Sequence, residues 1–175
     1  EVLTNLSSTK NNIILDFNYT ASTRLILKQC GLSDEDIDNR LIKVHGEASN
    51  NDIIFGVEDN AGIKKEHVFL RKAYNIKYKA LNFSELYDRI KSVAIFGHSL
   101  GETDHTYFNK LFQESCMYNK FSTNNNKEFW LFYYKENGYH CMMQQLDSLT
   151  HNSLTSFRQY NRVNFINTDK EKVFI

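Results

Sequence analysis

Short apolar runs alternate with amphipathic stretches along most of the chain, and this alternation is the feature that most constrains its fold. Strands separated by helical patterns connect most simply as parallel crossovers, because a helix returns the chain to the start of the next strand. The predicted fold class is therefore α/β, Rossmann-like, with a mostly parallel sheet flanked by helices. The predicted strands cover residues 12–17, 40–46, 51–59, 93–96, 129–134 and 163–167.

The helical patterns between these runs have an apolar spacing of three and four residues. One of them ends at Gly31, a typical residue just after a helix. The acidic segment 32–39 is predicted as a loop, and Asn137-Gly138 as a turn. The predicted helices cover residues 23–30, 64–75, 83–90, 104–114 and 142–149.

Length and composition narrow the class of protein. A chain of 175 residues with 41% hydrophobic residues fits a single α/β domain over 1–175. The net charge is zero, so we expect no nucleic-acid partner, and the lysine-rich stretch 64–79 is predicted to be a solvated face. No apolar run approaches the length of about 18 residues that spans a bilayer, so we expect no membrane partner and a cytoplasmic location.

The three cysteines give no sign of a structural metal or disulfide. Cys30, Cys116 and Cys141 lie far apart and outside any C-x-x-C pair. This spacing favours free thiols over a zinc site or a disulfide framework. No metal site is predicted.

Polar and glycine residues follow three of the predicted strands. They are Asn18-Tyr19-Thr20, His45-Gly46 and Gly97-His98-Ser99. In open α/β sheets, ligands bind at the carboxyl ends of the strands. We therefore expect the three turns to lie around one ligand site.

The third turn also matches the G-x-S-x-G pattern of a serine nucleophile elbow, as GHSLG at residues 97–101. A serine hydrolase needs an acid and then a histidine from separate loops. The best ordered pair, Asp147 and His151, lies only four residues apart beside one predicted helix. The residues after the turn, Glu102 to Asp104, resemble a helix N-cap cluster. A serine hydrolase is therefore the weaker alternative.

Taken together, the turns resemble the bacteriophage abortive infection AbiH family. The resemblance covers residues 13–112 and lies in DFNYT at 16–20, VHG at 44–46, IIFG at 53–56 and IFGHSLGETDHTYF at 95–108. It implies a bacterial antiviral defence protein, with a phage component as a partner. It also implies an upstream half with a glycine-rich G-N-G-F-D turn. The first glycine of this chain is Gly31, so we expect the chain to be the C-terminal part of a longer protein.

AbiH-like sequences are in turn distantly similar to sirtuin-like NAD-binding domains, which makes NAD the implied cofactor. This likeness implies that Asn18 lies near the ribose and that His45 is the counterpart of the catalytic base. Thr20 departs from the pattern, because those domains often have aspartate there. The residues implied to contact the cofactor are Tyr19, Thr20, Gly46, Gly97, His98, Ser99 and Asp104.

Each of these residues also has a purely structural interpretation, which leaves a non-catalytic interaction module open. His98 and Ser99 are residues that commonly hydrogen-bond within a turn. Asp104 is suited to cap the helix that follows it. Asn18 is an ordinary turn former.

The absence of a glycine-rich turn before Gly31 predicts weak nucleotide binding by this chain alone. Only glycine lets several backbone N–H groups approach a diphosphate at a helix N-terminus. Calorimetric titration of the 175-residue chain with NAD should give a millimolar or weaker affinity, since each 1.4 kcal/mol lost is about a tenfold loss. Micromolar binding, or release of nicotinamide, would contradict this prediction.

Overall fold

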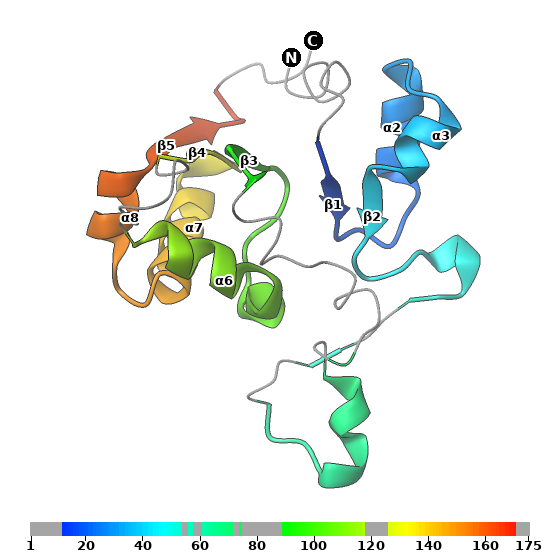
Figure 1. Cartoon of the computed structure of the whole chain (residues 1–175), viewed down its shortest axis with the longest axis horizontal. Helices are drawn as coiled ribbons and strands as arrows, with labels where there is room; N and C mark the ends of the chain where they lie inside the picture. Colours follow the sequence, from blue (N-terminus) through cyan, green and yellow to red (C-terminus); the bar gives the residue numbers. More distant parts are fainter. Residues whose placement is uncertain are drawn as a thin grey trace. The chain divides into compact units, whose positions relative to one another are not determined.

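Neighbouring strands pair in parallel throughout the part of the chain that the structure describes (Figure 1). The structure is a computed structural model that describes residues 12–53, 56–57, 61–71, 74, 89–117 and 126–170. One sheet pairs β1 (Ile14–Asp16) with β2 (Leu41–Lys43). The other has the order β3 (Ser92–Ile95), β4 (Glu128–Tyr133), β5 (Arg162–Asn167). The predicted α/β class with parallel strands flanked by helices is confirmed.

The chain divides into two compact units, with the boundary between Gly56 and Val57. Unit 1 contains the two-stranded sheet and unit 2 contains the three-stranded sheet. The single-domain organisation expected from the chain length stays a prediction.

Unit 1 has two helices between its strands, α2 (Ser22–Gln29) and α3 (Asp34–Asp38). Its core is formed by Leu27, Ile37 and Val44, each at most 1% exposed. Leu27 lies in α2, Ile37 in α3 and Val44 directly after β2, so burial of these apolar side chains joins both helices to the end of β2.

The helix α3 lies where an acidic loop was predicted, so that prediction is wrong. The Ser33 hydroxyl accepts a hydrogen bond from the backbone N–H of Asp36 at 3.1 Å, which is an N-cap. Acidic residues in a first helical turn are stabilised by the partial positive charge of the helix N-terminus. In addition, the hydrogen bond from Lys28 lowers the pKa of the Asp34 carboxyl.

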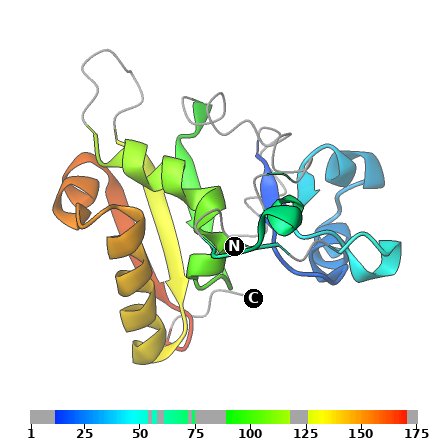
Figure 2. The ribbon, with the colours of Figure 1, turned by 90° about the horizontal axis from the view of Figure 1, so that it is seen from below.

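Among the described residues of unit 2, three helices pack with the sheet: α6 (His105–Ser115), α7 (Lys135–Leu149) and α8 (Leu154–Tyr160). Figure 2 shows α6 and α7 in front of the strands. The rings of Phe112, Phe129 and Phe157 meet at centroid distances of 4.8–5.6 Å and join α6, β4 and α8. These three side chains are at most 1% exposed, so the aromatic cluster is the centre of this core.

The start of α7 corrects a second prediction. Asn137 and Gly138, predicted as a turn, lie inside the first turns of α7. The change of chain direction occurs earlier, at Lys135, which has a left-handed φ of +57°. The first backbone N–H groups of a helix have no partner within the helix, so Asn and Gly are tolerated better there than in its middle.

Several other elements differ from the predictions. α8 was not predicted, because its seven residues carry only one fully buried side chain, Phe157. The helix predicted over 64–75 is a 3₁₀ helix over Lys65–Leu70. Where a strand was predicted at 51–59, the described residues form a single bridge between Val57 and Arg71. Residues 83–88 of the remaining predicted helix lie outside the described residues.

None of the described helices combines the length and the apolar character needed to cross a membrane.

The side chain of Asn161 connects three elements of unit 2. Its Nδ2 group donates to the carbonyl oxygens of Ser115 at 2.7 Å and Phe157 at 2.8 Å. Its Oδ1 accepts from the backbone N–H of Lys127 at 3.2 Å. One amide therefore links the C-terminal ends of α6 and α8 to the residue before β4.

We expect Asn161→Ala to lower the free energy of unfolding of unit 2 by about 2–4 kcal/mol, because three hydrogen bonds are lost and their partners are left unsatisfied. Urea denaturation followed by the fluorescence of Trp130, which lies in β4, measures the change. The control is Asn137→Ala on the exposed surface of α7, which should change stability by less than about 0.5 kcal/mol. Equal stability of the two variants would contradict the prediction.

Candidate functional site

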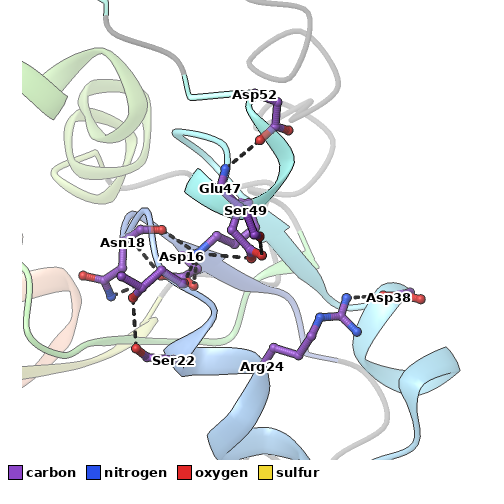
Figure 3. Close-up of polar contacts among 10 residues, drawn as sticks. Asp16, Asn18, Ser22, Arg24, Asp38, Glu47, Ser49 and Asp52 are labelled. Carbon is purple, nitrogen blue, oxygen red and sulfur yellow. Dashed lines mark hydrogen bonds and ion pairs between the residues drawn. The ribbon is translucent and has the colours of Figure 1, made fainter.

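The carboxyl ends of β1 and β2 carry a connected set of polar contacts in unit 1 (Figure 3). Parallel pairing places Asp16 beside Lys43 in the strand register, so the segments that follow both strands leave the sheet at one edge. We call residues 16–20 and 43–47 the turn cluster. Of the residues singled out from the sequence, it contains Asn18, Tyr19, Thr20, His45 and Gly46.

Lys43 is at the centre of the turn cluster. Its Nζ donates to Asp16 Oδ2 at 2.8 Å, to the carbonyl oxygen of Thr20 at 2.6 Å and to the carbonyl oxygen of Asn18. An ammonium group has three N–H donors, and these three acceptors match them in number. The Lys43 side chain is 14% exposed and that of Asp16 only 2%, so this ion pair is shielded from solvent.

Asp16 uses both oxygens of its carboxylate. Oδ2 accepts from Lys43, and Oδ1 accepts from the backbone N–H of Asn18 at 2.9 Å and from its side-chain Nδ2 at 3.2 Å. A buried carboxylate is costly unless it is paired and hydrogen-bonded, and these contacts meet that requirement.

His45 lies between two aromatic rings of the first turn. Its ring contacts Phe17 edge-on at 5.4 Å and stacks on Tyr19 at 5.7 Å with an interplanar angle of 26°. The residue is 8% exposed. A further bond, from the backbone N–H of Ala48 to the Tyr19 carbonyl oxygen at 2.8 Å, fixes the second turn against the first.

Gly46 makes the bend after His45 possible. It has a left-handed φ of +75°, and a Cβ there would lie 2.0 Å from the carbonyl oxygen of Asp52. The Asp52 carboxylate also accepts from the backbone N–H of Glu47 at 2.7 Å. The backbone at 46–47 is therefore closely packed against residue 52.

The balance of charge in the turn cluster is negative. Glu47 Oε2 lies 3.9 Å from Lys43 Nζ, and its side chain is 14% exposed. Lys43 therefore has two carboxylates, those of Asp16 and Glu47, within 4 Å. One cation and two anions give a local field that favours neutral or cationic ligand groups over a phosphate.

The third predicted turn, after β3, belongs to unit 2. Gly97 has a φ of +66° and Leu100 a φ of +55°, with the Leu100 side chain completely buried. Ser99 between them is exposed. In a nucleophile elbow the serine itself is on the strained turn, whereas here the left-handed residues flank it.

His98 and Asp104 contact each other across this turn. His98 Nε2 lies 3.2 Å from Asp104 Oδ2, while Nδ1 accepts from the backbone N–H of Leu100 at 2.9 Å. These bonds assign the proton to Nε2. Asp104 occupies the N-cap position of α6, but its carboxylate makes no capping bond and faces His98 instead.

The histidines available to a serine hydrolase, His140 and His151, contact side chains other than Ser99. His151 Nε2 lies 3.1 Å from Gln113 Nε2, and His140 is 3.8 Å from Glu136 on α7. Both histidines belong to the same unit as Ser99. These contacts give no support to a serine triad. Within the described ranges, His, Cys, Asp and Glu side chains form no group of three that could hold a metal ion.

The fold and these turns define the class of protein: an α/β protein with polar turns at the carboxyl ends of parallel strands. The family model described as Bacteriophage abortive infection AbiH matches residues 2–134. The chain therefore belongs to the AbiH family. Searches of curated proteins and of solved structures found no match.

The ion pair of the turn cluster, Asp16 with Lys43, was missed from the sequence. Each of the two residues occupies the last position of a short apolar strand, ILD and LIK. A charged residue at the end of a buried run is a sequence signal, because an unpaired charge is rarely buried. Its partner, however, depends on the strand register, which the sequence alone does not give.

Gly46→Ala should destabilise unit 1 more than Gly31→Ala. Both positions have a left-handed φ, which costs a residue with a Cβ about 1–2 kcal/mol. Only at Gly46 does the new Cβ also overlap the backbone, since nothing lies within 4 Å of it at Gly31. Overlap of this kind adds about 1–3 kcal/mol.

Native-state hydrogen exchange at the amides of Leu27 and Ile37, in the core of unit 1, measures this difference. We expect exchange in Gly46→Ala to be at least about tenfold faster than in Gly31→Ala, because a tenfold change corresponds to 1.4 kcal/mol. Equal rates would show that the backbone at 46–47 relaxes without cost.

Proposed function

We propose that the protein protects a bacterial host from phage by abortive infection, and that the turn cluster binds the sugar portion of an NAD-type nucleotide. The first part follows from membership of the AbiH family. The observation that supports the second is the set of hydrogen-bonding groups at the joined carboxyl ends of β1 and β2, where α/β proteins bind their ligands.

The chemistry of the turn cluster favours a sugar over a phosphate. All three donors of Lys43 have acceptors within the protein, so its cation is engaged. The two neighbouring carboxylates disfavour an anionic group. Ribose hydroxyls are neutral and donate hydrogen bonds, and the exposed Asn18, Tyr19 and Thr20 provide polar groups for them.

His45 is the proposed catalytic group. An imidazole suits proton transfer near neutral pH, and the stacking of its ring on Tyr19 fixes its orientation. The proposed reaction is hydrolysis of the bond between the ribose and nicotinamide. Water adds to the sugar carbon, its proton passes to His45, and nicotinamide leaves with the bonding electrons.

The turn after β3 belongs to unit 2, and the cofactor contacts expected from the sequence for Gly97, His98, Ser99 and Asp104 stay a prediction. Both ring nitrogens of His98 are engaged, which suits a residue that fixes the shape of the turn. The exposed segment at Ser99 then offers backbone groups to a ligand.

Phage challenge of a sensitive host that expresses the complete gene to which this sequence belongs tests the proposal. The gene should reduce plaquing, and Asn18→Ala or His45→Ala should each restore plaquing by at least about tenfold, the effect of losing 1.4 kcal/mol of binding or transition-state energy. The matched controls are Asn50→Ala and His140→Ala, two exposed residues outside the turn cluster. Both should retain protection.

Mass spectrometry of NAD in infected cultures separates the two parts of the proposal. NAD should fall in cells with the unaltered protein and remain constant with His45→Ala. Protection without loss of NAD would leave abortive infection standing and overturn NAD hydrolysis. No protection against a broad phage panel would count against the defence role itself. Loss of protection in Ser99→Ala would favour the serine hydrolase.

A further inference from the structure

We infer that Asp16 and Lys43 are positioning residues, which hold Asn18 with its amide oxygen presented to the ligand. This inference rests on the proposed function of the turn cluster. It assigns a role to two charged side chains that do not themselves contact the ligand, and it defines the kind of ligand group that Asn18 receives.

Lys43 shapes the first turn from the neighbouring strand. Its ammonium bonds the carbonyl oxygens of Asn18 and Thr20, two residues apart, and thereby holds the chain in a bend around one nitrogen. The same group pairs with Asp16, its partner in the strand register. The bend is therefore fixed to β2 as well as to β1.

Asp16 then determines the orientation of the Asn18 amide. Its Oδ1 lies 2.9 Å from the backbone nitrogen and 3.2 Å from the side-chain Nδ2 of Asn18. A carboxylate paired with a lysine only accepts hydrogen bonds, so the amide nitrogen and not the oxygen must face it. The amide oxygen and nitrogen are bonded to the same planar carbon, so when the nitrogen faces Asp16 the oxygen points away from Asp16.

The presented oxygen limits the ligand group that fits. Asn18 is exposed, and its amide oxygen accepts but cannot donate. The complementary group is a hydrogen-bond donor such as a sugar hydroxyl. A phosphate or carboxylate would meet an acceptor there and a negative field around it. The Asp16–Lys43 pair thus makes the turn cluster selective for a hydroxyl.

The test replaces the pair by neutral side chains of similar size, in the double variant Asp16→Asn with Lys43→Met. Removing both charges leaves neither member of the Asp16–Lys43 pair as an unpaired buried ion, so the fold is disturbed less than by the loss of one member alone. The matched control is Lys28→Met with Asp34→Asn, an exposed pair of the same residue types in unit 1, with a separation of 2.7 Å. Phage protection and the NMR signals of the Asn18 backbone and side-chain amides are measured for each.

The double variant should lose at least about tenfold in protection, as Asn18→Ala does, and its Asn18 amide signals should shift and exchange faster with water. The control variant should retain phage protection and the wild-type Asn18 amide signals. NMR titration with NAD, which detects millimolar affinity, should show the Asn18 signals responding in the control and not in the double variant. If the Asp16–Lys43 pair only stabilised the fold, the Asn18 side-chain amide of a folded double variant would keep its NMR signals.

Wild-type protection with unchanged Asn18 signals in the double variant would overturn the inference and leave the proposed function intact. Wild-type protection in Asn18→Ala would overturn both the inference and the proposed binding of a ligand by the turn cluster, because Asn18 would then have no role. If the double variant does not fold, the single variant Asp16→Asn decides by the same readouts, because Glu47 still lies 3.9 Å from the Lys43 ammonium there. Asparagine has nearly the same shape as aspartate and replaces one of its two acceptor oxygens by an N–H donor.

Discussion

Parallel pairing of neighbouring strands is the constraint on which the rest of this structure depends. A parallel pair requires a crossover, so the chain between β1 and β2 contains α2 and α3, and the chain between β3 and β4 contains α6. The same pairing brings the carboxyl ends of adjacent strands to one edge of the sheet. Asp16 and Lys43, 27 residues apart in sequence, meet for this reason.

The elements with long apolar patterns could be predicted from the sequence, and the short ones could not. The run at 129–134 identified β4, since Phe129, Leu131 and Phe132 are all buried. α3 and α8 are five and seven residues long, so neither has enough turns to display a helical period. α3 is instead stabilised by its Ser33 cap and by ion pairs to α2, which are tertiary contacts.

The sequence indicated which turns carry the candidate site residues, but it did not indicate which side chains and backbone groups bond to one another there. Polar residues after apolar strands indicated the segments around Asn18, His45 and Gly97, because a parallel sheet exposes those ends. The hydrogen bond from the Leu100 backbone N–H to His98 Nδ1 forms in a turn where Leu100 has a left-handed backbone, which few residues other than glycine adopt. No local sequence pattern predicts a left-handed backbone at a leucine.

The segments proposed to bind ligand and the C-terminal elements that stabilise unit 2 lie in different parts of the chain. The match ends at residue 134, the residue after β4, and includes every polar turn proposed to bind ligand. The elements beyond it, α7, α8 and β5, contribute the other side of β4 and the buried Phe157. Without β5, β4 would be left with an open edge, and without α8 the aromatic cluster would lose one of its three rings. The C-terminal segment therefore stabilises unit 2, while the polar groups proposed to contact ligand come from the residues before it.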